Sequence, residues 1–187
     1  SFASDNSIEY VDFMKLDAES AELDILKGAI QTLKKSVLGL SIEVWFQPWH
    51  SGQPVFSDVD AFLRPLGFRL FDLATYRMRR EALPEATLSL VPGPTKQGQI
   101  ISGEALYLRD GANELVSKNT FESGWDDVKI MKLVSVMELF CLPDCAIELI
   151  QVAYRQGFLQ DKDVNHLTDL LVPGTGGNYV SYSAYLE

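Results

Sequence analysis

The chain has 187 residues, of which 47% are hydrophobic, and its formal net charge is −10. This size and apolar content predict a globular protein with one core and room for a small second one. Nucleic acids and anionic membrane surfaces attract clustered Lys and Arg, so the acidic balance speaks against both as main partners and favours a neutral substrate. No apolar run nears the roughly 20 residues of a membrane-spanning helix and no signal peptide is visible, which together predict a cytoplasmic protein.

The first predicted elements are a strand and a helix separated by acidic residues. Residues Tyr10–Leu16 are mostly apolar and too short for a helix, which is typical of a strand buried on both faces. From Ser20 the apolar residues recur at helical spacing through Leu33, so we expect one amphipathic helix. Glu22 falls in the first turn of this helix, where we expect it to face solvent and favour the helix dipole.

Three more strands and a helix are predicted in the first part of the chain. Val37–Phe46 reads as a buried strand that ends before Pro48, because proline cannot donate to a sheet ladder. Ser57 resembles the N-cap of a following helix. Two further strands are expected at Phe68–Thr75 and Ile100–Leu108, with no helix between them, so we expect these two to pair antiparallel.

The remainder of the chain shows only helical patterns. Apolar spacing predicts helices around Leu133–Phe140, from Pro143 to Gly157, and over Asp161–Val172. We therefore predict an α/β domain over residues 1–111 and a helical extension over residues 112–187.

The sequence contains no convincing metal or disulfide signature. Cys141 and Cys145 lie one helical turn apart without a nearby histidine, so we expect buried thiols of the core rather than zinc ligands. The glycine-rich stretch Gly174–Gly177 neither clearly follows a strand nor precedes a helix, which speaks against a cofactor loop.

Carboxylates gather where two predicted strands end, which is where open α/β sheets bind ligands. Asp17 and Glu19 directly follow the first strand, and Glu43 interrupts the second, where a buried acid needs a partner. Asp17 and Glu19 could hold substrate hydroxyls, act as a base or bind a divalent cation, or could merely satisfy free amides at a helix start. Glu43 could likewise belong to the site, or could position the loop after it through an internal hydrogen bond. His50 follows the second strand and has a side chain suited to general-base work, unless it is simply exposed.

Several other residues have both a functional and a structural interpretation. Trp45 and Trp49 could stack on a sugar or belong to ordinary packing. Three arginines follow the third predicted strand, namely Arg77, Arg79 and Arg80. They could contact an anionic ligand, although a solvated strand edge is the simpler interpretation. For His166 we expect a structural role.

Two adjoining segments stand out at the end of the first predicted strand, Lys15–Glu22 (KLDAESAE) and Leu23–Ala29 (LDILKGA). With them, the first part of the chain resembles the FkbM family of S-adenosylmethionine-dependent methyltransferases. Three later segments are also similar to family sequences: Glu43–Pro48, Gly52–Phe56 and Leu66–Phe68. The chain departs from the family pattern at Ser20, where glycine is usual, and at His50, where tyrosine is more common; we expect Ser20 to be tolerated at a helix start.

The resemblance implies a fold, a cofactor and a reaction. It implies the second half of a Rossmann-like methyltransferase sheet, mostly parallel with the last strand antiparallel, followed by a small helical region. It further implies O-methylation of a sugar or natural-product hydroxyl, with Asp17 at the cofactor and acceptor, Glu19 and Glu43 in support, and His50 as a spare base. No metal is implied.

The family's glycine-rich turn and the acid after its second strand are not found upstream of Asp12. We therefore expect weak cofactor binding by this segment alone, and an open sheet edge at the strand through Lys15. A missing N-terminal half or a second copy of the chain would cover that edge. The alternative is a non-catalytic methyltransferase-like module for assembly or glycan binding.

Overall fold

The computed structural model describes residues 5–80, 82, 97–117, 122–173 and 179–187. The helix expected to begin at Pro143 does begin there. The glycine-rich stretch Gly174–Gly177 and most of the stretch Pro92–Gly98 lie outside the described residues. The chain divides into two compact units, Ser1–Leu108 and Arg109–Glu187.

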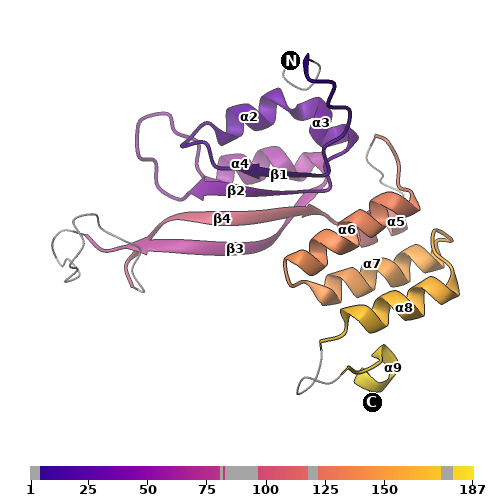
Figure 1. Ribbon diagram of the computed structural model, residues 1–187. Helices are drawn as coiled ribbons and strands as arrows, with labels where there is room; N and C mark the ends of the chain where they lie inside the picture. The colour runs from indigo at the N-terminus through magenta and orange to yellow at the C-terminus, as the bar shows by residue number, and fades with distance from the viewer. Residues whose placement is uncertain (1–4, 81, 83–96, 118–121, 174–178) are drawn as a thin grey trace. The chain divides into compact units, whose positions relative to one another are not determined.

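The first unit is a four-stranded mixed sheet with helices, which gives the chain an α/β fold (Figure 1). Its strands are β1 (Phe13–Leu16), β2 (Gly39–Trp45), β3 (Phe68–Met78) and β4 (Gln99–Arg109), in the order β1-β2-β4-β3. β1 and β2 pair parallel, and β4 pairs antiparallel with β2. Figure 1 shows β3 and β4 running in opposite directions. The last strand along the chain, β4, is thus antiparallel to β2 as expected, and it lies between β2 and β3.

The helices of this unit pack on one face of the sheet. They are α2 (Glu22–Gly28), α3 (Ile30–Lys35) and α4 (Phe56–Leu63), followed by the 3-10 turn η1 (Arg64–Leu66). Side chains from β2 meet them in the core, and Leu40, Ile42 and Val44 are at most 1% exposed. Because side chains alternate along a strand, Ser41, Glu43 and Trp45 lie on the opposite face of β2.

Two details of these helices correct the sequence prediction. The single helix expected from Ser20 is broken into α2 and α3 at Ala29, which follows Gly28, a poor helix former. Ser57 lies inside α4 rather than at its N-cap, which is Val55. The carboxylate of Asp58 accepts a hydrogen bond from the Val55 amide at 2.8 Å and so satisfies the helix start in place of Ser57.

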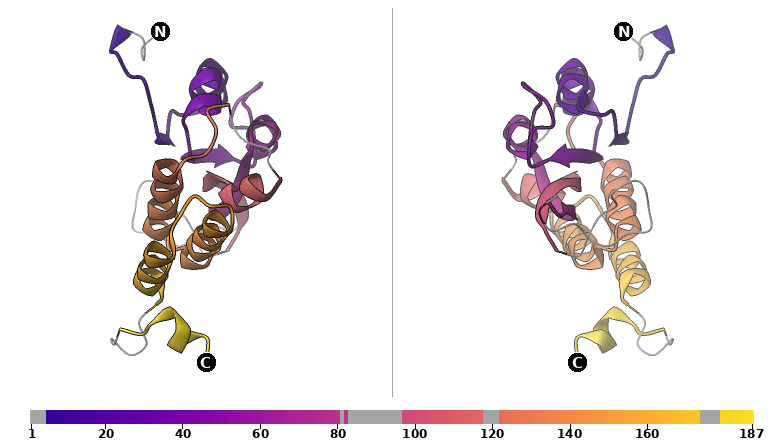
Figure 2. Two further views of the ribbon diagram at one scale, coloured as in Figure 1. Left: turned by 90° about the vertical axis from the view of Figure 1, so that its right-hand side faces the viewer. Right: turned by 90° about the vertical axis from the view of Figure 1, so that its left-hand side faces the viewer.

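The second unit is helical, with α5 (Gly111–Ser117), α6 (Asp127–Leu139), α7 (Pro143–Arg155), α8 (Asp161–Leu171) and α9 (Tyr182–Tyr185). The last three predicted helices are present, whereas α5 and α9 are too short for the apolar spacing to reveal. α7 packs against α5, α6 and α8, and α9 contacts α8. In Figure 2 the colour of these helices runs from pink-red at α5 through orange to yellow at α9, which lies at the C-terminal end. No helix of the described residues is long and apolar enough to cross a membrane.

A buried ion pair anchors the start of this unit. The Arg109 side chain is 2% exposed and donates to Glu114 Oε1 at 3.2 Å, while the Trp125 indole donates to Glu114 Oε2 at 3.2 Å. Burial lowers the pKa of Arg109 and raises the pKa of Glu114, and their mutual attraction opposes both shifts.

The cysteines are not buried core thiols, which corrects the sequence prediction. Cys141 is exposed with φ 57°, because it lies in the turn between α6 and α7, and Cys145 is half-buried. Burial and the adjacent Asp144 raise the pKa of the Cys145 thiol to about 11. This thiol lines a cavity of about 530 Å³ at α7 and α9, and it stays protonated there.

Candidate functional site

The turn after β1 carries two of the acids singled out in the sequence, and a third, Glu22, begins α2. Asp17 is exposed, and Glu19 and Ser20 have φ of 50° and 86°, in the left-handed region. Glu22 is only 4% exposed, so the expectation of a solvated helix face is wrong. Its Oε1 accepts hydrogen bonds from the amides of Ala18 at 2.7 Å and Ser20 at 3.4 Å. Glu22 is therefore a structural residue that holds the turn in place.

A polar row crosses the helix-free face of the sheet from β1 to β4. Lys15 Nζ donates to Glu104 Oε1 at 2.5 Å and lies 3.8 Å from Asp17 Oδ2. Ser41 Oγ also donates to Glu104 Oε1. Burial acts to lower the pKa of Lys15, but the hydrogen bond and charge of Glu104 outweigh it and raise that pKa. Lys15 therefore stays charged and ties the end of β1 to β4.

Glu43 lies on β2 beside this polar row, among other carboxylates. It lies opposite Glu104 in the register of β2 and β4, so two like charges face each other. Its Oε2 atom is buried without a hydrogen-bond partner. Burial raises the pKa of Glu43, and nearby carboxylates raise it further. These carboxylates belong to Asp17, Glu19, Glu22 and Glu104.

The loop after β2 presents an aromatic pair. The rings of Trp45 and Trp49 lie edge to face with centroids 5.6 Å apart, and Trp49 is 70% exposed. Gln53 is 6% exposed, and its Oε1 accepts from the amides of Trp49 at 2.6 Å and His50 at 3.3 Å. The Trp45 Nε1 and Gln53 Nε2 donors are buried without partners. Gln53 therefore fixes the backbone that presents the Trp49 indole.

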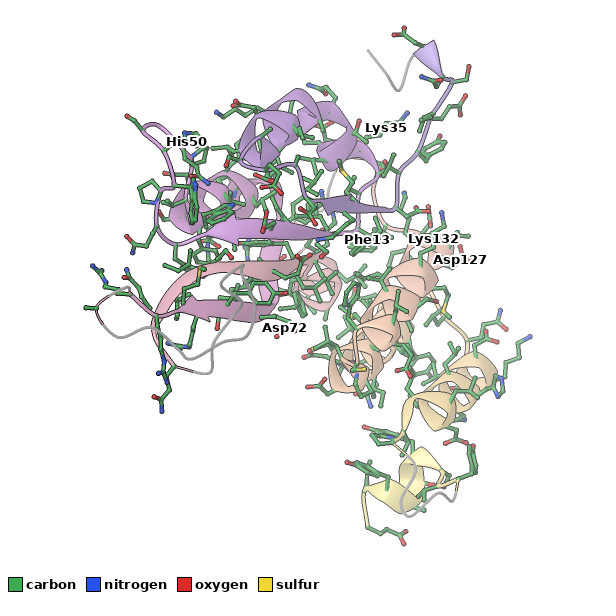
Figure 3. The ribbon with its side chains drawn as sticks, turned by 60° about the vertical axis from the view of Figure 1, so that its left-hand side comes forward. Phe13, Lys35, His50, Asp72, Asp127 and Lys132 are labelled. Atoms are coloured by element: carbon green, nitrogen blue, oxygen red, sulfur yellow. The ribbon has the colours of Figure 1, made fainter. Side chains whose placement is uncertain are left out.

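His50 lies apart from the carboxylates in its interactions. It is exposed, and its Nδ1 lies 3.3 Å from the Ser51 carbonyl oxygen. Figure 3 shows it on the loop beyond the end of β2, at the end of the sheet opposite to Phe13. Within the part of the chain that the structure describes, no hydrogen bond or ion pair joins His50 to Asp17, Glu19 or Glu43.

The structure thus brings Asp17, Glu19 and Glu43 within electrostatic reach of one another, as their places after β1 and on β2 suggested. The sequence reasoning missed Glu104 and Gln53. Glu104 stands alone as an acid in an apolar strand, the same signal that singled out Glu43, whereas the burial of Gln53 leaves no sequence signal.

The carboxylates do not form a metal site in this structure. Among the described residues, no group of three or more His, Cys, Asp or Glu side chains has the arrangement to hold a metal ion. Two of the expected arginines contact the start of β4 and the residue before it: Arg77 on β3 donates to the Gly98 carbonyl oxygen at 3.2 Å, and Arg80 after β3 donates to Gln99 at 2.7 Å. His166 is exposed on α8.

Comparison with known proteins gives one match. Residues 1–70 match the family model described as the methyltransferase FkbM domain. This match contains β1, β2, α4 and the carboxylates Asp17, Glu19 and Glu43, and it confirms the FkbM resemblance inferred from the sequence. Searches of curated proteins and of solved structures found no match.

Proposed function

We propose that the protein is an S-adenosylmethionine-dependent methyltransferase that methylates a hydroxyl oxygen, with Glu43 as the proton acceptor and Asp17 as the residue that orients the acceptor. The match of residues 1–70 to the FkbM methyltransferase domain supports the reaction class. The observation that carries the assignment of the site is the placement of Glu43 opposite Glu104 in the register of β2 and β4, with its Oε2 buried without a hydrogen-bond partner.

The acidic cluster fits part of the cofactor. S-adenosylmethionine carries a positively charged sulfonium and ribose hydroxyls, both of which carboxylates attract. Asp17 is exposed at the end of β1 and is the residue that would hold these groups. The glycine-rich cradle that the family resemblance implies after the first strand of the whole fold is not found upstream of Asp12, so these residues fit only part of the cofactor.

The acids on the sheet suit proton removal from an alcohol. When bound, S-adenosylmethionine supplies the methyl group as an electrophilic carbon. A hydroxyl oxygen attacks this carbon efficiently only if its proton leaves, and a carboxylate whose pKa is raised is a better proton acceptor than an ordinary one. Glu43 has this property, and Lys15 near Asp17 keeps a positive charge beside the cluster. Glu19 is exposed and contributes negative potential, which disfavours an anionic acceptor.

The test is methyl transfer from radiolabelled S-adenosylmethionine in excess to a panel of small alcohols and glycosides. We expect label on the acceptor oxygen, and a loss of about 100-fold or more in Glu43→Gln, the typical contribution of a general base. Asp24→Asn is the matched control, because Asp24 is 80% exposed in an ion pair with Lys27 on the outer side of α2. Absence of transfer to every acceptor would overturn the proposal and leave the non-catalytic module.

A further inference from the structure

The cavity of about 530 Å³ in the helical unit is lined by one face of α7 and by residues of α9. Its volume falls within the range of about 300 to 1,000 Å³ that is typical of small-molecule sites. All of its lining residues lie between positions 143 and 186, beyond the FkbM match to residues 1–70. The function proposed above therefore does not account for this cavity.

The wall that α7 contributes carries two carboxylates. Asp144 and Glu148 are four residues apart on this helix, so their side chains are neighbours on one helical face. Both residues are exposed, and no ion pair within the described part of the chain involves either one. The N-terminus of α7 adds only about half a positive charge beside Asp144, so the electrostatic potential at this wall is negative.

The Cys145 thiol shows that this negative potential extends to the cavity wall. Burial raises the pKa of the thiol to about 11, and the charges of Asp144, Glu148 and Asp110 act in the same direction. No Lys, Arg or His occurs among the described residues that line the cavity. The wall therefore repels an anion and attracts a cation.

Two tyrosine rings from α9, Tyr182 and Tyr185, also line the cavity. Tyr182 is held in place, because its hydroxyl accepts from Gln151 Nε2 on α7 at 3.0 Å and its amide donates to Asp169 Oδ1 on α8 at 2.8 Å. Aromatic rings attract cations to their faces and offer apolar surface as well, and Ile147 adds to that surface. This lining suits a positive charge attached to an apolar body.

We propose that this cavity binds a small organic cation, with an ammonium group beside Asp144 and Glu148 and an apolar body against Ile147 and the tyrosine rings of α9. A metal ion fits less well, because no group of three or more His, Cys, Asp or Glu among the described residues has the arrangement to hold one. The inference is independent of the proposed methyl transfer, so either can fail without the other.

Heteronuclear NMR titration of the whole chain tests the site, with three probes that share a phenethyl body. They are phenethylammonium, the neutral phenethyl alcohol and the anionic hydrocinnamate. We expect phenethylammonium to shift the amide signals of α7 and α9, and to bind roughly fivefold or more tightly than the alcohol, because two carboxylates attract it. Hydrocinnamate should bind most weakly.

Variants of exposed lining residues separate the contributions of charge and ring. The double variant Asp144→Asn with Glu148→Gln should weaken phenethylammonium binding about tenfold and leave the alcohol unaffected. Tyr185→Ala removes a ring that is 53% exposed and should weaken binding by about twofold to fivefold. Glu138→Gln is the matched control, because it removes an exposed carboxylate of α6 that does not line the cavity.

The dispersion of the same amide signals shows that each variant is folded. Three results would overturn the inference: no probe shifts the amides of α7 and α9, the alcohol or hydrocinnamate binds as tightly as phenethylammonium, or the double variant binds phenethylammonium like the unmodified chain.

Discussion

Ser20 has a backbone conformation that favours glycine over residues with a side chain. Its φ of 86° lies in the left-handed region, where an L-side chain costs about 1 to 2 kcal/mol. The chain has serine where the FkbM pattern usually has glycine, and the expectation that serine is harmless at a helix start is wrong, because α2 begins only at Glu22. The strain therefore lies in the turn that carries Asp17.

Ser20→Gly should raise the free energy of unfolding by about 0.5 to 1 kcal/mol, the relief of strain less the greater freedom of glycine in the unfolded chain. Urea unfolding measures it. Ser57→Gly, inside α4, should lower the free energy of unfolding by a similar amount. Equal or lower stability of Ser20→Gly would show that the turn is not strained.

Glu43 should make stability depend on pH. Its pKa in the folded protein is raised above the ordinary value of 4.5, so the folded state holds the proton more tightly than the unfolded state. The stabilising contribution is complete below pH 4.5 and is lost as pH rises through the raised pKa. In Glu43→Gln this fall in unfolding free energy should be absent. A parallel pH dependence of the two proteins would mean that Glu43 titrates normally.

The sequence predicted the carboxylate site in part, for physical reasons. Asp17 and Glu43 could be found because acids after or within an apolar strand contrast with their neighbours. The burial of Glu22 could not be predicted, because it depends on the backbone conformation of the turn, which lets two amides donate to one carboxylate. Glu104 is far from the others in sequence and joins them only through the register of β2 and β4.

At the scale of elements, the strands and longer helices followed from apolar spacing, whereas the break at Ala29 and the insertion of β4 between β2 and β3 did not. Spacing continues through Ala29 because both α2 and α3 present leucines to the same core. Strand order depends on contacts between distant segments, which local patterns do not encode.

Gly28→Ala should stabilise α2. An added Cβ at Gly28 meets nothing within 4 Å, and alanine favours a helix over glycine by about 0.5 to 1 kcal/mol. Thermal unfolding measures the gain. Gly111→Ala is the contrasting variant, since its Cβ would lie 3.0 Å from Leu133 and 3.1 Å from Leu149 and should lower the melting temperature. Destabilisation by Gly28→Ala would contradict this account of the break.

The buried pair of Arg109 and Glu114 should be essential to the helical unit. Arg109→Met leaves the Glu114 carboxylate buried without its cation, and we expect a loss of about 3 to 5 kcal/mol in unfolding free energy. The double variant with Glu114→Leu should recover much of this loss, because apolar groups then replace both charges. If the double variant is no more stable than Arg109→Met alone, the buried ion pair between Arg109 and Glu114 does not have the stabilising role described here.

At the scale of the whole molecule, the first unit has one face covered by helices and one that carries the polar row. β1 is an edge strand of the described sheet, the strand for which the sequence predicts cover by a missing N-terminal half or a second copy of the chain. The net charge of −10 and the acids around Glu43 together favour a neutral acceptor and a cationic methyl donor.

The most direct test of the central claim, that Glu43 takes the proton of the acceptor hydroxyl, is the pH profile of methyl transfer at saturating S-adenosylmethionine and acceptor. We predict that the rate rises with pH to a plateau, with a midpoint above 4.5, as Glu43 loses its proton. Glu43→Gln should be about 100-fold slower and should lose this rise. The same profile and rate in Glu43→Gln would contradict the claim.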